Sequence, residues 1–224
     1  MSTTWRLTLL EDWVKANRPE DKHAAELIKS LSRSAFILDY HLILARDAFA
    51  ELEGPDGNGL KLFAAMANFE PSFSRAALAH EANTLAAVHT IRNYADIFAQ
   101  LANALVMPKP LQIHDCDFFK VADNLPPSIL KEKMQALKDS YWFRYLAAFS
   151  NISKHRHLIQ SKPTAVLKEN VIGLRIKEFP YKFNKRENET TFKQCWAHDL
   201  LEEIHNVYRS ILELGQELNR HVMN

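Results

Sequence analysis

The sequence predicts a mainly α-helical protein, an up-and-down helical bundle of four or more long helices with a small antiparallel β insertion before the last helix. Apolar residues recur at every third or fourth position over long stretches, which is typical of helices with one face in a core. Only five glycines and nine prolines occur in 224 residues, whereas a β-sandwich uses many turns. The content of 47% apolar and 25% charged residues is that of a folded chain with a substantial core.

The first long helix is predicted over residues 19–53. Pro19 suits a first turn, and Glu20 and Asp21 suit the positive end of the helix dipole. The turn-forming segment GPDGNG at 54–59 should end this helix, and a short helix is expected over 60–68. The inward face is expected to contain Leu27, Leu31, Ala35, Leu38, Leu42, Ala45, Phe49 and Leu52.

A second long helix is predicted over residues 74–106, followed by a loop over 107–128. Two further helices are expected over 128–138 and 140–160, and the last over 196–222. The inward residues of the second long helix should be Leu78, Leu85, Val88, Ile91, Ala95, Phe98, Ala102 and Leu105. Those of the last helix should be Trp196, Leu200, Ile204, Val207, Ile211, Leu214 and Leu218.

The pattern changes between the last two helices. Residues 164–196 alternate between apolar and polar types and are rich in β-branched and aromatic side chains, which predicts two to four short strands. The insertion is placed at 162–194. Because no repeat or low-complexity tract occurs, the chain is predicted to form a single helical-bundle domain spanning 1–224.

The spacing of the cysteines and the hydropathy of the chain predict where in the cell the protein is located. Cys116 and Cys195 lie 79 positions apart with no CxxC or CxxH partner, which makes a zinc site unexpected and fits a reducing compartment. No metal or cofactor is predicted. The start MSTTWRLTLLEDW has no signal-peptide pattern, and charges interrupt every long helix, so we expect a cytoplasmic protein with no membrane span.

Positive charge is concentrated in one part of the chain. Residues 150–193 contain ten Lys and Arg against four Glu, a local charge of +6 on a chain whose net charge is +1. A basic segment on a near-neutral chain indicates an anionic partner such as RNA. The alternative is a solvated, lysine-rich hairpin.

The segment FSNISKHRHLI at 149–159 contains the densest group of cationic and titratable side chains in the sequence. On a helix, Arg144, Asn151 and His155 are separated by seven and four positions and share one stripe. Attack of a ribose 2′-hydroxyl on its own phosphodiester needs a group that takes the proton, a cation for the developing charge and a polar orienting group. The alternative is an ordinary hydrogen bond between Asn151 and His155 beside solvated cations.

The order of HTIRNYADIF at 89–98, the 149–159 segment, a β excursion and a terminal helix resembles the HEPN superfamily of all-helical domains. Many of these domains are metal-independent ribonucleases of toxin, antiphage or RNA-processing systems, commonly homodimers with the site at the dimer interface. The resemblance implies an RNA partner and a homodimer. Together with the shared helix stripe, it leads us to expect that the catalytic residues are Arg144, Asn151 and His155. The expected nucleic-acid-binding residues are Lys154, Arg156, His157 and Arg92.

The spacing of arginine and histidine departs from the family pattern. Active members have an Arg followed after a short interval by His, whereas Arg144 precedes His155 by eleven positions. The shorter spacing occurs at Arg18…His23, where Pro19 disfavours a helical Arg18, and at Arg75…His80, a reserve candidate.

Two other functions fit the pattern. Glu20…His23 and Glu202…His205 have the Glu-x-x-His spacing of di-metal helical bundles, but further inward carboxylates are not evident. A non-catalytic interaction or dimerisation module with weak anion or RNA binding would use the same bundle and the same basic segment.

Overall fold

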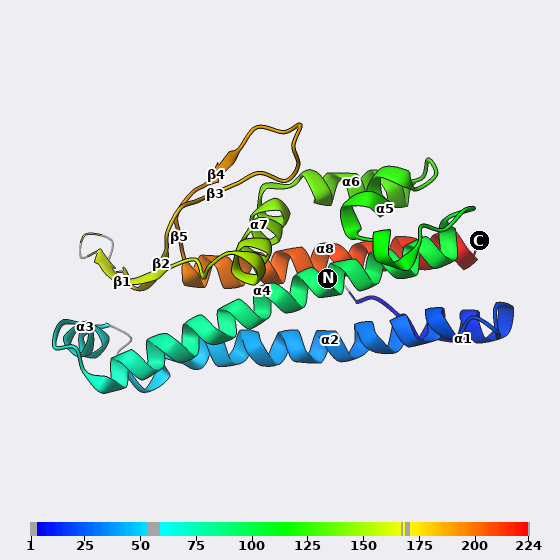
Figure 1. The fold of residues 1–224 in the computed structure, drawn as a ribbon. Coiled ribbons are helices and arrows are strands. Elements are labelled where there is room, and N and C mark those ends of the chain that lie inside the picture. The colour runs from blue at the N-terminus through cyan, green and yellow to red at the C-terminus, as the bar shows by residue number, and fades with distance from the viewer. Residues whose placement is uncertain (1–3, 53–58, 167, 169–170, 224) are drawn as a thin grey trace. The chain divides into compact units, whose positions relative to one another are not determined.

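The computed structural model describes residues 4–52, 59–166, 168 and 171–223. Within these residues the chain forms eight α-helices, with short antiparallel strands before the last helix (Figure 1). The prediction of a mainly helical chain with a small β insertion in that place is therefore confirmed. None of the described helices combines the length and the apolar character needed to cross a membrane.

The bounds of the elements follow the chain. The helices are α1 (Leu7–Asn17), α2 (Lys22–Asp47), α3 (Leu60–Ala67), α4 (Pro71–Val106), α5 (Phe118–Asn124), α6 (Ile129–Asp139), α7 (Tyr141–His155) and α8 (Ala197–Met223), with 3-10 turns at Ala50–Leu52 and Ile113–Asp115. The strands are β1 (Ser161–Val166), β2 (Val171–Ile176), β3 (Phe179–Tyr181), β4 (Thr190–Phe192) and β5 (Cys195–Trp196).

The strands form two small antiparallel sheets. The first has the order β1-β2-β5, and the second pairs β3 with β4. In the second sheet Phe179 lies opposite Phe192, and Tyr181 lies opposite Thr190. The prediction of two to four strands thus missed one, the two-residue β5.

Several predicted helix ends differ from the observed ones. Helix α2 ends at Asp47, and the rest of its predicted span contains a 3-10 turn; most of the GPDGNG segment lies outside the described residues. Helix α4 begins at Pro71 rather than residue 74, because proline is well suited to a first helical position. Helix α7 ends at His155 rather than residue 160.

The prediction of a loop throughout 107–128 was wrong, because residues 118–124 form α5. The Asp117 carboxylate accepts a hydrogen bond from the Lys120 backbone N–H at 2.8 Å and caps the helix. Phe118 and Val121 are fully buried. With only seven residues the helix offers two turns of periodicity, too few to stand out in the sequence.

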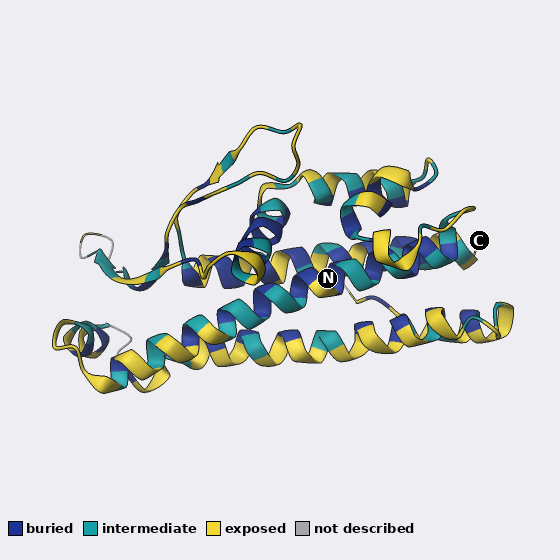
Figure 2. Ribbon diagram, in the orientation of Figure 1, coloured by how far each residue is buried: buried dark blue, intermediate teal, exposed yellow. Residues whose placement is uncertain are grey.

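The predicted inward faces are buried almost throughout (Figure 2). On α8, Leu200, Ile204, Ile211 and Leu218 are fully buried. Of the predicted inward residues, Ala35, Leu85 and Trp196 are half-buried, and Leu78 near the start of α4 is 67% exposed. Trp196 belongs to β5 and not to the last helix. Helical periodicity thus identified most of the core face.

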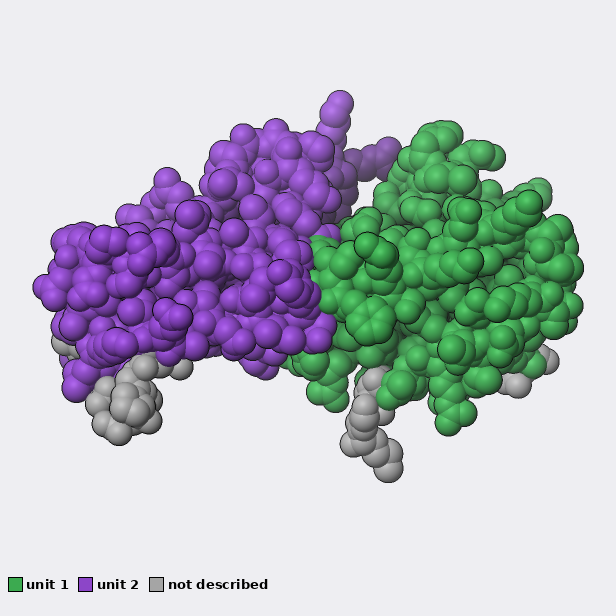
Figure 3. Space-filling view, turned by 90° about the horizontal axis from the view of Figure 1, so that it is seen from below, with its two compact units in different colours: residues 1–37, 90–144, 205–224 green, residues 38–89, 145–204 purple. Residues whose placement is uncertain are grey.

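The chain divides into two compact units (Figure 3). Unit 1 comprises residues 1–37, 90–144 and 205–224, and unit 2 comprises 38–89 and 145–204. The boundaries fall within α2, α4, α7 and α8, so each of these helices contributes residues to both units.

Unit 1 fixes its N-terminal segment by a close approach of Trp5 to α8. Gly215 lies under the indole, and a Cβ at that position would be 2.1 Å from a ring carbon of Trp5. The indole N–H donates to Asn219 Oδ1 at 3.0 Å. A side chain larger than hydrogen at position 215 would therefore displace Trp5.

Unit 2 has an aromatic core between α7 and the β3–β4 sheet. The ring of Tyr145 lies edge-on to Phe179 and Phe192, with ring centres 5.0 and 5.5 Å away. Phe149 adds an edge-on contact to Phe179 at 6.0 Å. All four rings are buried, so this cluster holds the sheet on the helix.

The turn between α3 and α4 carries backbone strain. Phe69 has φ +53°, and the backbone N–H of Glu70 donates to the Ala65 carbonyl, the helix-ending pattern in which glycine is usual. Its ring is 87% exposed, so little packing offsets the strain.

We expect Phe69→Gly to raise the free energy of unfolding by about 0.5–1 kcal/mol, because glycine adopts positive φ without a Cβ clash. Urea unfolding measures the change. Phe69→Ala is the control, since it removes the ring and retains the strain, and it should leave stability nearly unchanged. A Phe69→Gly variant less stable than wild type would show that the backbone at Phe69 is not strained.

Candidate functional site

The C-terminal end of α7 presents a cluster of exposed cationic and imidazole side chains. Lys154, His155, Arg156 and His157 are all exposed. The backbone N–H groups of Arg156 and His157 donate to the Ile152 carbonyl at 2.9 and 3.2 Å, which ends the helix there. Cations are favourable at this negative end of the helix dipole. The local fold therefore stabilises positive charge in contact with solvent.

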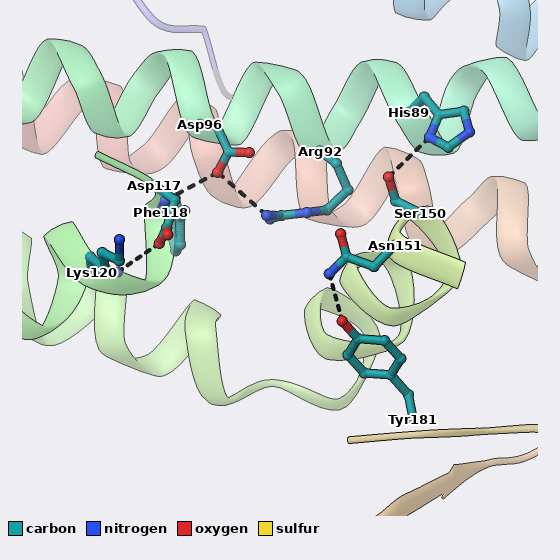
Figure 4. A network of polar contacts seen from close by, with 9 residues as sticks. All are labelled: His89, Arg92, Asp96, Asp117, Phe118, Lys120, Ser150, Asn151 and Tyr181. Atoms are coloured by element: carbon teal, nitrogen blue, oxygen red, sulfur yellow. Dashed lines mark hydrogen bonds and ion pairs between the residues drawn. The ribbon is translucent and has the colours of Figure 1, made fainter. Parts of the chain in front are cut away.

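Tyr181 joins this helix end to strand β3. Asn151 Nδ2 donates to the Tyr181 hydroxyl at 3.0 Å (Figure 4), and the Arg156 guanidinium lies 5.5 Å from the Tyr181 ring centre. The hydrogen bond and the cation–π contact together orient Asn151 and Arg156. No described residue donates a hydrogen bond to Asn151 Oδ1, so this oxygen is available to a donor such as a ribose hydroxyl.

A second polar pair, formed by the half-buried His89 and the buried Ser150, lies next to Asn151 on α7. His89 Nδ1 is 2.9 Å from the hydroxyl of Ser150, whose side chain is buried (Figure 4). Burial lowers the pKa of His89, and the charge of Lys154 lowers it further. His89 is therefore suited to a neutral hydrogen-bonding role.

Arg144 and the other two proposed catalytic residues fall in different units. Arg144 is half-buried in unit 1, and its backbone N–H donates to the Ser140 carbonyl at 3.1 Å. Asn151 and His155 belong to unit 2, with His155 as the last, exposed residue of α7. Within unit 2, Asn151 and Arg156 meet at Tyr181, and His155 lies beside Arg156 in the chain.

Arg92 is buried in unit 1, with 9% of its surface exposed. Its Nη2 lies 3.3 Å from Asp96 Oδ1, and its guanidinium is 4.8 Å from the ring centre of Phe143. The same carboxylate oxygen accepts the Phe118 backbone N–H at 3.1 Å (Figure 4). Arg92 thus helps to hold the start of α5. Its Nη1 is buried with no hydrogen-bond partner among the described residues.

In each of the two pairs with the shorter spacing, Arg18…His23 and Arg75…His80, the arginine and the histidine lie in different environments. Arg18 donates to the Ala104 and Leu105 carbonyls at 2.9 and 3.2 Å, so it caps the end of α4, while His23 is exposed. Arg75 is also exposed, whereas His80 is buried. Among the described residues, neither arginine forms a hydrogen bond with the histidine of its own pair.

His80 packs in the core of unit 2. Its ring centre lies 5.5 Å from that of Phe49, and Nδ1 is 3.2 Å from the Thr84 hydroxyl. Burial, aided by the charge of His198, lowers the pKa of His80 to about 4. His80 is consequently neutral at neutral pH.

Tyr181 was not among the residues predicted from the sequence. The sequence pattern that could have identified it is the alternation of side chains along a strand. This alternation places Tyr181 on the same side of β3 as the buried Phe179, facing α7. Among the residues that the structure describes, no group of three or more His, Cys, Asp or Glu side chains could hold a metal ion.

The buried His80 should make stability depend on pH. The unfolded chain gains a proton at this position below pH 6.5, whereas the folded chain does so only near pH 4, so folding loses free energy as pH falls between these values. We expect wild type to lose about 2 kcal/mol more than His80→Gln between pH 7 and pH 5. Urea unfolding at both pH values measures this, and equal losses would contradict the assignment.

In comparisons with models of protein families, with curated proteins and with solved structures, no match to this chain was found.

Proposed function

We propose that this chain is a HEPN-like domain that binds single-stranded RNA at the end of α7 and cleaves it without a metal ion. The observation that carries the proposal is the exposed cluster of Lys154, His155, Arg156 and His157 beside a Tyr181 that orients Asn151 and Arg156. An imidazole, a guanidinium and an amide are the side-chain types that cleavage through the ribose 2′-hydroxyl requires.

In the proposed reaction His155 takes the proton of the 2′-hydroxyl. The 2′-oxygen forms a bond to the adjacent phosphorus, the bond from phosphorus to the 5′-oxygen breaks, and the leaving oxygen takes a proton from water. Arg156 would stabilise the negative charge that develops on the phosphoryl oxygens. Asn151 would accept a hydrogen bond from the sugar at Oδ1, while its Nδ2 stays on Tyr181.

The exposed cations of the β segment would hold the RNA backbone by releasing counterions. Those with exposed side chains are Lys162, Lys168, Lys177, Lys182, Lys185, Arg186 and Lys193. The proposal also includes two predictions from the sequence, an up-and-down bundle and Arg144 as a second phosphate-binding group. The resemblance adds a homodimer and a place in a toxin or antiphage system.

A non-catalytic interaction module is the second candidate. It is favoured by exposed apolar side chains on the part of α2 in unit 2, where Tyr40 and Ile43 are 58% and 47% exposed. Large exposed apolar side chains on one helix are typical of protein-binding surfaces. In such a module the α7 cluster would bind RNA without turnover.

We expect His155→Ala to reduce cleavage of a fluorescent single-stranded RNA by about 100-fold or more, because general acid–base catalysis contributes at least that factor. Thermal stability should change by no more than about 1 kcal/mol, as for other exposed positions. The assay contains EDTA, which keeps contaminating metal-dependent nucleases inactive.

The matched control is His114→Ala, which removes another exposed histidine, on the 3-10 turn of unit 1, and should cleave like wild type. Undiminished cleavage by His155→Ala would remove His155 from the mechanism. If wild type binds the RNA and never cleaves it, the chain is the non-catalytic module.

A further inference from the structure

Unit 2 contains a pocket away from the α7 cluster. Its volume is about 360 Å³, and its walls come from the end of α2, from α3, α4, β2 and the start of α8. Pockets for small molecules range from about 300 to 1,000 Å³, so this pocket is suited to a small ligand.

The inner wall of the pocket is apolar. Phe49, Leu62, Leu174 and Leu201 line it, and each is at most 7% exposed. These side chains belong to the core, so the wall is formed before any ligand enters. An aliphatic or aromatic group of modest size would be removed from water here.

Two opposite charges lie together on the same pocket. Arg46 Nη2 is 3.5 Å from Glu202 Oε1, and the two side chains are 43% and 68% exposed. A single contact at this distance uses one of the five N–H donors of the guanidinium and one of the two carboxylate oxygens. The remaining donors and the second oxygen are available to a ligand.

His80 adds a neutral polar group. It lines the pocket at 6% exposure, and its Nδ1 contacts the Thr84 hydroxyl. A buried imidazole of this kind provides a hydrogen bond without altering the charge of the site.

The geometry points to a zwitterionic ligand with an apolar body, and we propose that the pocket binds a free apolar α-amino acid. The carboxylate would pair with Arg46, the ammonium with Glu202, and the side chain would lie between Phe49 and Leu201. A simple anion would face the Glu202 carboxylate, and a simple cation would face Arg46. A ligand that carries both charges satisfies both groups.

Isothermal titration of the full chain with L-leucine and L-phenylalanine tests the proposal. Leucine without its ammonium group is 4-methylpentanoate, and without its carboxylate it is 3-methylbutylamine; glycine lacks the apolar body. We expect at least one of the two amino acids to bind, with the corresponding single-charge analogues and glycine at least about tenfold weaker.

Arg46→Met and Glu202→Gln should each weaken amino-acid binding at least about tenfold, whereas Arg33→Met, at an exposed position of the same helix in unit 1, should leave it unchanged. No binding at millimolar concentration would overturn the proposal. So would equal affinity for a single-charge analogue, or binding unaffected by Arg46→Met and Glu202→Gln. None of these results bears on cleavage of RNA.

Discussion

The packing of α7 against the β3–β4 sheet is the constraint on which the candidate site depends. Tyr145 and Phe149 on the helix meet Phe179 and Phe192 on the strands in a buried aromatic cluster. Because side chains alternate along a strand, burial of Phe179 also turns Tyr181 toward α7, where it accepts the hydrogen bond from Asn151. Core packing thereby sets the positions of polar groups that are themselves partly exposed.

Helix α7 has its core residues and its exposed cations in different parts of its length. The Tyr145–Ile152 stretch of α7 supplies core residues, and the following turn supplies the cations. Positive charge has a low free-energy cost there, because it is solvated and lies at the negative end of the helix dipole. The buried Arg92 instead pairs through Nη2 with Asp96 and packs on the ring of Phe143, both in its own unit.

The sequence predicted the long helices, because their apolar periodicity extends over many turns, and it predicted the β insertion from its alternation and β-branched content. It did not predict where α7 ends. Ile152 and Ile159 are seven positions apart, as a continuing helix would require, and both are buried, but Ile159 lies in a segment that is neither helix nor strand. No Gly or Pro marks the end at His155.

The site was predictable to the extent that its residues are adjacent in the chain. The basic cluster could be read from residues 151–157, whereas Tyr181 lies 30 positions from Asn151 and comes close only through the aromatic cluster. Burial of Arg92 was likewise not evident, because a polar residue on a long helix gives no sign of the rings that pack on it.

Salt dependence of binding to single-stranded RNA is the most direct test of the claim that the end of α7 is a nucleic-acid surface. Each phosphate neutralised on a single strand contributes about 0.7 to the slope of log affinity against log salt. The double variant Lys154→Gln, Arg156→Gln should reduce that slope by about 1.4, and the control Lys29→Gln, Arg33→Gln on α2 should not change it. An unchanged slope in the α7 variant would contradict the account.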